Sequence, residues 1–263
     1  MVSAFGDTEK PTSWGVNATE LAYWMGDWVK TYDLDGIDID YEDFNAVWSG
    51  DTTEWLIEFT QALRERLPQG EYLLSHAPVA PWFCPAGGSS YIEINNRVGD
   101  LIDWYSVQFY NQGDHYLDCN TLLWNSSGTY PGSSLFEIRD AGVDLDKLVI
   151  GKPSSPGEAY SGFIDTETLA SCVKQAKDNG WNGGVMVWDY PDADKEWIKA
   201  VRAMSWPMET SRNSAEDAVT GGSDDEVIDD ATDVVADDTT DEVVEHMVGE
   251  ATDVTTDGVA DNR

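Results

Sequence analysis

Basic side chains are scarce in this chain. Its 263 residues contain 15 Lys and Arg against 50 Asp and Glu, which gives a formal net charge of -35. Nucleic-acid binding depends on cationic side chains that neutralise phosphates, so this balance excludes nucleic acid as a partner. A neutral polymer remains a suitable partner.

Long hydrophobic runs are also absent. No window approaches the roughly 18 apolar residues that cross a bilayer, so we expect no membrane span. Residues 1–6 include neither a basic segment nor a long apolar run, and this predicts no signal peptide in this chain.

Cysteine is rare, with Cys84, Cys119 and Cys172 widely spaced along the chain. Three thiols cannot all pair within one chain, and their spacing has no metal-ligand pattern. We therefore expect buried thiols or a single bridge. No feature of the sequence requires a metal or an organic cofactor, so we expect neither.

The chain nevertheless has ample material for a core, since 41% of it is hydrophobic and it contains twelve Trp. This composition fits one barrel-sized domain, which we place at residues 1–206. Residues 207–263 differ, with 18 acidic residues against 2 Arg and no Trp, Tyr or Phe. Such a segment cannot bury enough apolar surface to order itself, so we predict a disordered acidic tail.

Hydrophobic periodicity alternates between strand-like and helix-like segments along residues 1–204. The predicted strands are residues 1–7, 35–43, 72–77, 104–110, 147–151 and 183–190. The predicted helices follow them around residues 21–29, with Asn17 or Thr19 as the cap, and at residues 55–67, 91–102, near 120–141, 166–179 and about 193–204. Six successive βα units predict an α/β fold with a parallel sheet, of the TIM-type (β/α)8 barrel kind.

The second strand has an acidic side chain at every second position. Successive side chains on a strand point to opposite faces, so three acids share one face: Asp38, Asp40 and Glu42. The opposite face is apolar: Ile37, Ile39 and Tyr41. Acids about 6 to 7 Å apart in a poorly solvated place resist full ionisation, so at least one should stay protonated near neutral pH. The alternative is a calcium loop, but such loops need polar residues and a glycine inside the run.

In a parallel barrel the active site lies at the carboxyl ends of the strands, where Glu42 is the last inward side chain. A protonated Glu42 above Asp40 and Asp38 is arranged to give a proton to a leaving oxygen. Ordinary glycosidases place two carboxyls on opposite sides of the sugar, whereas these acids come from one strand. A sugar with a 2-acetamido group can supply its own nucleophile, and Asp40 would then orient that group.

Residues 35–42, Asp-Gly-Ile-Asp-Ile-Asp-Tyr-Glu, resemble the signature of glycoside hydrolase family 18, the chitinases and their relatives. Two further stretches agree with it. Residues 106–111, Ser-Val-Gln-Phe-Tyr-Asn, and residues 185–189, Val-Met-Val-Trp-Asp, resemble later strands of plant and fungal chitinases. The resemblance covers residues 1 to about 202.

The resemblance implies a role for each site residue. Glu42 is the general acid and base, Asp40 the partner of the acetamido group and Asp38 its electrostatic support. The implied substrate ligands are Gln108, Tyr110, Asn111 and Trp188, the last as a stacking platform. Trp82, Phe83 and Trp124 either extend the groove or pack in the core, and we interpret His76 and His115 as structural.

The resemblance also implies a function, a retaining endo-hydrolase of chitin, the β-1,4-linked N-acetylglucosamine polymer. The alternatives are an endo-β-N-acetylglucosaminidase acting on N-glycans, and a chitin-binding or inactive relative. By resemblance we expect an extracellular protein, and we expect a monomer. Six units are two fewer than a closed barrel needs, which predicts that the first two βα units are missing through truncation at the N-terminus.

Overall fold

The structure is a computed structural model that describes residues 1–84 and 91–207. The predicted acidic tail lies outside the described residues, apart from Pro207. No helix among the residues described is long and apolar enough to cross a bilayer.

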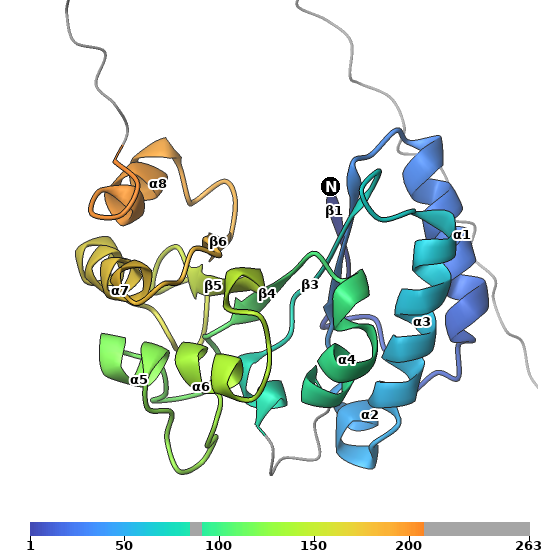
Figure 1. Ribbon diagram of the computed structural model, residues 1–263, viewed down its shortest axis with the longest axis horizontal. Helices are drawn as coiled ribbons and strands as arrows, with labels where there is room; N and C mark the ends of the chain where they lie inside the picture. The colour runs from blue at the N-terminus through green and yellow to red at the C-terminus, as the bar shows by residue number, and fades with distance from the viewer. Residues whose placement is uncertain (85–90, 208–263) are drawn as a thin grey trace, which may run out of the picture. The chain divides into compact units, whose positions relative to one another are not determined.

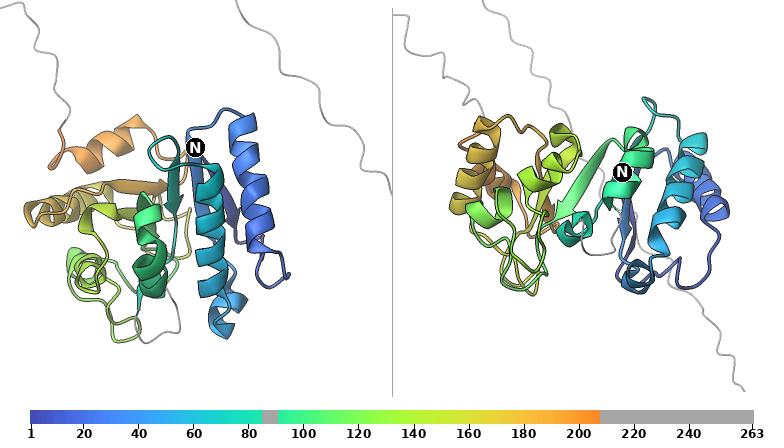
Figure 2. Two further views of the ribbon diagram at one scale, coloured as in Figure 1. Left: turned by 45° about the vertical axis from the view of Figure 1, so that its right-hand side comes forward. Right: turned by 60° about the horizontal axis from the view of Figure 1, so that its bottom comes forward.

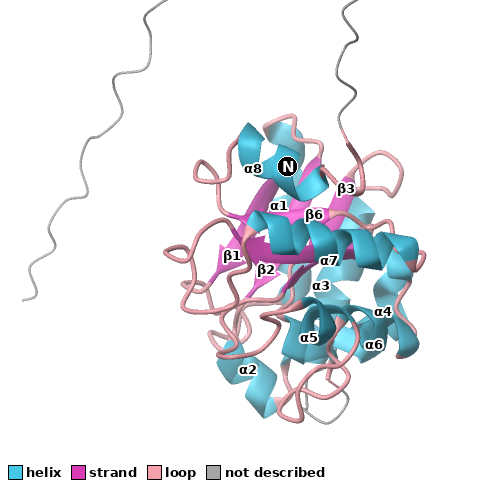
Figure 3. Cartoon of the chain, turned by 90° about the vertical axis from the view of Figure 1, so that its left-hand side faces the viewer, coloured by secondary structure: helices cyan, strands magenta, loops and turns pink. Residues whose placement is uncertain are grey.

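Six parallel strands form one sheet in which each strand pairs with the next one in the chain. They are β1 (Val2–Gly6), β2 (Gly36–Tyr41), β3 (Leu73–His76), β4 (Trp104–Gln108), β5 (Leu148–Pro153) and β6 (Val185–Trp188). The sheet curls into an open half-barrel (Figures 1 and 3). This confirms the predicted α/β architecture with six strands of an incomplete barrel.

Helices connect the strands, as parallel pairing requires. They are α1 (Ala18–Thr31), α2 (Phe44–Ser49), α3 (Thr52–Arg66), α4 (Tyr91–Val98), α5 (Cys119–Leu123), α6 (Leu135–Asp140), α7 (Thr166–Asp178) and α8 (Lys195–Arg202), with 3-10 turns η1 (Ala80–Phe83), η2 (Gly99–Leu101) and η3 (Leu145–Lys147). The helix predicted at residues 120–141 is two short helices, because Pro131 and Gly132 lie between them. The predicted helix at 91–102 continues after Val98 as η2, and α2 was not predicted.

The helices pack on the face of the sheet that carries the apolar side chains of β2. Ile37, Ile39 and Tyr41 are at most 1% exposed and belong to the main hydrophobic cluster. Helices α1 and α3 lie side by side over this part of the sheet (Figure 2). Full burial of such a side chain contributes about 1.5 to 3 kcal/mol to the stability of the fold. Burial of this apolar face therefore determines that the alternate side chains of β2 point to the opposite face of the sheet.

Strands β2 and β3 approach each other closely at Gly36. A Cβ atom added to Gly36 would lie 2.0 Å from the carbonyl oxygen of Leu73, the partner of Gly36 in the ladder. Only glycine allows this approach at the start of the acidic strand.

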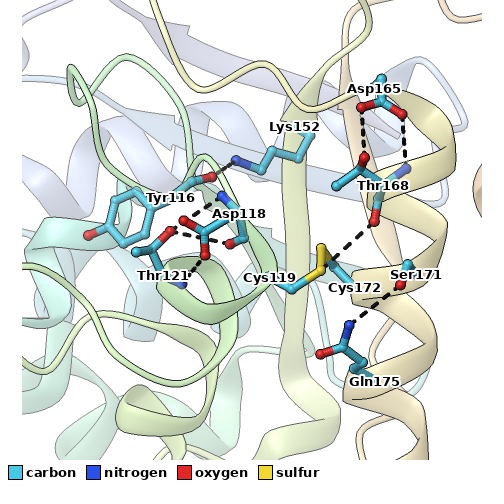
Figure 4. The surroundings of a disulfide bond; sticks show 10 residues. All are labelled: Tyr116, Asp118, Cys119, Thr121, Lys152, Asp165, Thr168, Ser171, Cys172 and Gln175. Carbon is cyan, nitrogen blue, oxygen red and sulfur yellow. Dashed lines mark hydrogen bonds between the residues drawn. A yellow bond between two sulfur atoms is a disulfide. The ribbon is translucent and has the colours of Figure 1, made fainter.

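A disulfide joins Cys119 of α5 to Cys172 of α7 (Figure 4). Both helices begin with a capping aspartate: Asp118 accepts from the Thr121 N–H at 2.9 Å, and Asp165 accepts from the Thr168 N–H at 2.9 Å. Cys84 is a buried free thiol. One bridge and one buried thiol agree with the prediction, although the sequence did not identify the pair.

The two outer strands of the sheet each have one strand partner within the described residues: β1 pairs with β2, and β6 pairs with β5. An apolar groove runs beside each of them. The groove beside β1 has a volume of about 500 Å³ and includes Trp14, Trp24 and Trp28. The groove beside β6 has a volume of about 390 Å³ and includes Trp197 and Ile198.

Candidate active site

The three acids lie on the face of the sheet opposite the helix core. Asp38 and Asp40 alternate along β2 with fully buried apolar residues, and Glu42 follows directly after the strand ends at Tyr41. The predicted division of β2 into an apolar face and an acidic face is therefore confirmed.

Asp38 is held by hydroxyl groups of both neighbouring strands. In the ladder it is opposite Ser3 on β1 and Ser75 on β3. Its carboxylate accepts hydrogen bonds from Ser3 Oγ at 2.8 Å and from Ser75 Oγ at 2.5 Å. Burial raises the pKa of Asp38, and these two hydrogen bonds oppose the increase.

Gln108, at the end of β4, contacts both of the outer acids. Its Nε2 donates to Asp40 Oδ1 at 2.8 Å, to the Ala77 carbonyl at 2.8 Å and to Glu42 Oε1 at 3.2 Å. An amide nitrogen has only two hydrogens for these three acceptors, so the Glu42 contact, the longest, is the weakest. Gln108 therefore fixes Asp40 and leaves the Glu42 carboxyl available to a further partner.

The pKa of Asp40 is raised to about 8, first by burial and then by the negative charges of Glu42 and Asp38, while the hydrogen bond from Gln108 opposes the shift. The pKa of Glu42 is also raised, first by burial, with the charge of Asp7 adding to the effect and Gln108 and Lys10 opposing it. This agrees with the expectation that at least one acid is protonated near neutral pH. The sequence argument assigned that proton to Glu42, whereas the larger shift belongs to Asp40, which is flanked by an acid on each side.

Glu42 lies where two cavities meet. The first, of about 370 Å³, is lined by Gly6, Asp7, Asp40, Glu42, Gln108, Tyr110, Asn111 and Trp188 among others. The second, of about 340 Å³, shares Glu42, Gln108 and Asn111 with it and continues over Phe44, Trp48, Trp82 and Tyr130. An elongated ligand that occupied both cavities would pass Glu42 near its middle.

The structure brings six of the seven predicted site residues to the wall of the first cavity, and Asp38 lies in the adjoining hollow. Tyr110 is buried, and its pKa is raised by burial and by the nearby acids. Trp188 is 45% exposed, which leaves its ring accessible. The Asn111 backbone has a φ of 65°, and its N–H donates to the Ser161 carbonyl at 3.0 Å.

For three aromatic residues the sequence allowed either a place in the groove or a place in the core, and the structure puts one in a cavity wall and two in the packing. Trp82 lines the second cavity. Phe83 is fully buried, and Trp124 stacks on Phe136 with ring centroids 4.1 Å apart, so both belong to the packing. Among the two histidines, His76 is fully buried between Thr60 Oγ1 and the Tyr91 hydroxyl, both at 3.3 Å.

Sequence reasoning missed two charged residues near the acids. Asp7 lines the first cavity from the loop after β1, and Lys10 Nζ donates to the Glu42 carbonyl at 2.8 Å. No local pattern marks either of them. Their position follows from the pairing of β1 with β2, which places the ends of these strands next to each other.

Among the described residues, one group of carboxylates has a spacing that could hold a cation. Oxygens of Glu158, Asp189 and Asp192 lie within 4.8 Å of one another. An all-oxygen set suits hard cations such as Ca²⁺, but the group does not include the acids of β2, and we assign no function to it.

No protein-family model matches the chain. Three curated relatives are chitinase 1 of Candida albicans (31% identical over 165 residues, 61% of this chain and 30% of that protein), a chitinase of Enterococcus faecalis (27% over 176 residues, 61% and 50%) and an acidic endochitinase of Nicotiana tabacum (29% over 175 residues, 64% and 51%). The chain thus spans about half the length of these relatives, or less.

Among the solved structures that resemble this one are two enzymes of known structure. A GH18 chitinase from Pseudoalteromonas aurantia superposes with a TM-score of 0.68 at 30% identity, over 78% of this chain and 74% of that one. A fungal endo-β-N-acetylglucosaminidase of family 18 has a TM-score of 0.55 at 24% identity, over 70% and 62%, and shows the fold alone.

This protein has a curled parallel sheet with an acidic ladder at the carboxyl end of one strand. These features place it in the class of barrel-type glycoside hydrolases. Similarity to the Pseudoalteromonas enzyme over most of both chains then identifies the family. The chain belongs to glycoside hydrolase family 18.

Proposed function

We propose that the protein is a retaining, endo-acting hydrolase of β-1,4-linked N-acetylglucosamine polymers, with Glu42 as general acid and base. One observation carries the proposal: Glu42 lies where two cavities meet, with Asp40 and Gln108 beside it. The names of the curated relatives, all chitinases or endochitinases, support the same substrate.

The geometry favours attack by the substrate's own acetamido group. Asp40 and Glu42 both contact the same nitrogen of Gln108, so they lie on one side of the cavity and do not flank a sugar from opposite faces. In two-carboxyl glycosidases the second acid lies across the sugar ring. Here the acetamido carbonyl oxygen would attack C1 while Glu42 gives its proton to the departing glycosidic oxygen.

The other site residues have supporting roles in this mechanism. Asp40 accepts the acetamido N–H and so orients the carbonyl oxygen toward C1, while the Tyr110 hydroxyl binds the same group. Trp188 provides an apolar face for the sugar ring. In the second half of the reaction, water attacks C1 from the side of the departed group while Glu42 removes a proton from that water. The bond between C1 and the acetamido oxygen breaks in the same step, so the product retains its configuration.

The disulfide supports an extracellular location. Bridges such as Cys119–Cys172 form and persist in oxidising compartments and are rare in the cytosol.

Two alternatives use the same cavity. One is an endo-β-N-acetylglucosaminidase acting on N-glycans, and a fungal endo-β-N-acetylglucosaminidase of family 18 has the same fold. A binding protein without catalysis is the other, and a chitinase-like agglutinin of Robinia pseudoacacia shares the fold with a TM-score of 0.52 at 15% identity. The intact acid at position 42 favours catalysis over binding alone.

The test is hydrolysis of N-acetylglucosamine oligomers and of a high-mannose glycopeptide by the full chain, compared with Glu42→Gln. We expect cleavage of the oligomers to β-anomeric products, and a loss of turnover by about 100-fold or more in Glu42→Gln, because a general acid contributes about 10² to 10⁴ in rate. Exposed Glu20→Gln is the matched control and should retain wild-type turnover. Equal turnover in Glu42→Gln and the wild type would refute the assignment.

A further inference from the structure

Lys152 is a fully buried cation near the carboxyl end of β5. Its Nζ donates to three backbone carbonyl groups: Phe109 at 2.7 Å, Tyr116 at 2.7 Å and Gly162 at 2.9 Å. The contact with Tyr116 is visible in Figure 4. An ammonium group has three N–H donors, so each donor has one acceptor and none is unused.

Within residues 1–84 and 91–207, no carboxylate pairs with this charge. Lys152 takes part in none of the ion pairs found among the described residues. Burial lowers its pKa to about 7. An apolar side chain of similar length would fill the same space without the cost of burying a charge. The role of a lysine at this position is therefore to donate hydrogen bonds to the three carbonyl groups.

Those carbonyl groups belong to the two loops that carry part of the cavity wall. The Phe109 carbonyl is in the peptide bond to Tyr110, and Tyr116 follows in the same loop after β4. Gly162 lies in the loop after β5 and packs against Tyr110, because a Cβ at Gly162 would lie 2.5 Å from Tyr110 Cα. Lys152 thus joins both loops at the point where Tyr110 enters the cavity.

Asn111 connects the same two loops. Its backbone N–H donates to the Ser161 carbonyl at 3.0 Å, and its Oδ1 accepts from the Tyr160 N–H at 2.8 Å. Both bonds require residues 160–162 to stay beside residues 109–111. The three carbonyl contacts of Lys152 join the same two loops.

We propose that Lys152 is a positioning residue that holds Tyr110 and Asn111 in the wall of the active-site cavity through these three backbone carbonyl groups. It has no contact with substrate. The inference rests on the proposed function for the roles of Tyr110 and Asn111, but the placement of the two loops can be tested without activity.

The experiment compares Lys152→Met with Lys147→Met in the full chain. Lys147 is the matched control, because its Nζ also donates to two backbone carbonyl groups, Gly99 at 2.9 Å and Ile102 at 2.8 Å, which do not line the cavity. The first measurement is hydrogen exchange at the Asn111 and Tyr160 amides. We expect faster exchange at both amides in Lys152→Met and wild-type exchange in Lys147→Met.

The second measurement is steady-state hydrolysis of N-acetylglucosamine oligomers. Misplaced binding groups can cost about 10²-fold, so Lys152→Met should lower kcat by about 10- to 100-fold per folded molecule with a smaller change in KM. Lys152→Arg, which retains N–H donors, should restore part of both the protection and kcat. A purely structural role would leave kcat per folded molecule unchanged.

Unchanged exchange at Asn111 and Tyr160 in folded Lys152→Met would overturn the proposal. If that variant does not fold, the wild-type chain decides the question, since exchange of these two amides as fast as in an open loop would also overturn it. A wild type that hydrolyses no oligomer would instead contradict the proposed function, and the exchange measurement would still decide the role of Lys152.

Discussion

At the scale of single residues, the acids at the carboxyl end of β2 determine the chemistry. Their alternation with Ile37, Ile39 and Tyr41 is visible in the sequence, because a period of two assigns each side chain to a face. Their environment is not visible there. Ser3, Ser75 and Gln108 reach Asp38 and Asp40 from other strands, at sequence separations that local patterns do not report.

Asp7 allows a direct test of substrate-assisted attack. Among the described residues, Asp7 is the carboxylate that lines the first cavity in addition to Asp40 and Glu42. Asp40 lies on the same side as Glu42, so a two-carboxyl mechanism would need Asp7 as nucleophile or base. We expect Asp7→Asn to keep turnover within about tenfold of the wild type, far above Glu42→Gln. Because the charge of Asp7 raises the pKa of Asp40 and of Glu42, the pH above which kcat/KM falls should move downward in this variant. Turnover as low as that of Glu42→Gln would contradict attack by the acetamido group.

Asp40 should make the folded chain less stable as the pH rises. In the unfolded chain its carboxyl loses a proton near the ordinary value of 3.8, whereas in the folded chain it keeps the proton up to about pH 8. The folded state therefore binds more protons between these values, and stability falls with rising pH across that interval.

Replacing Asp40 with Asn removes this dependence. The thermal unfolding midpoint of Asp40→Asn should exceed that of the wild type by a margin that grows from pH 4 to pH 8, while turnover is lost. Asp165→Asn is the control, since hydrogen bonds from Thr168 at the start of α7 lower the pKa of Asp165. A margin that does not change with pH would show that Asp40 is not protonated in the folded chain.

At the scale of elements, the sequence predicted each strand and most helices, because hydrophobic periodicity and the residues Pro and Gly are local signals. It did not predict α2, which has only six residues, or the break between α5 and α6. The disulfide between α5 and α7 was also out of reach. Three cysteines allow three pairings, and only the packing of these two helices selects one of them.

Gly36 should be essential to the pairing of β2 with β3. In Gly36→Ala the new Cβ would lie 2.0 Å from the Leu73 carbonyl oxygen, so the strands must separate at the start of the acidic strand. Overpacking of this kind costs about 1 to 3 kcal/mol, which urea unfolding would measure.

Gly128→Ala is the matched control, because nothing lies within 4 Å of the added Cβ. Its free energy of unfolding should stay within about 0.5 kcal/mol of the wild type. Equal stability of the two variants would contradict the close approach of the strands.

At the scale of the whole molecule, composition predicts that the folded part ends near residue 206. We predict that a chain ending at Pro207 has the same unfolding midpoint and the same turnover as the full chain, because the removed segment has no aromatic residue and a large excess of acids. Differential scanning calorimetry and oligomer hydrolysis measure the two quantities. A midpoint several degrees lower would show that residues 208–263 stabilise the folded part.

The two grooves beside β1 and β6 affect how any unfolding experiment on this protein is read. Apolar hollows with exposed tryptophans, Trp14 and Trp24 among them, are binding sites for hydrophobic dyes in the native state. Strong fluorescence of such a dye at room temperature would then come from intact molecules and would not indicate a molten globule.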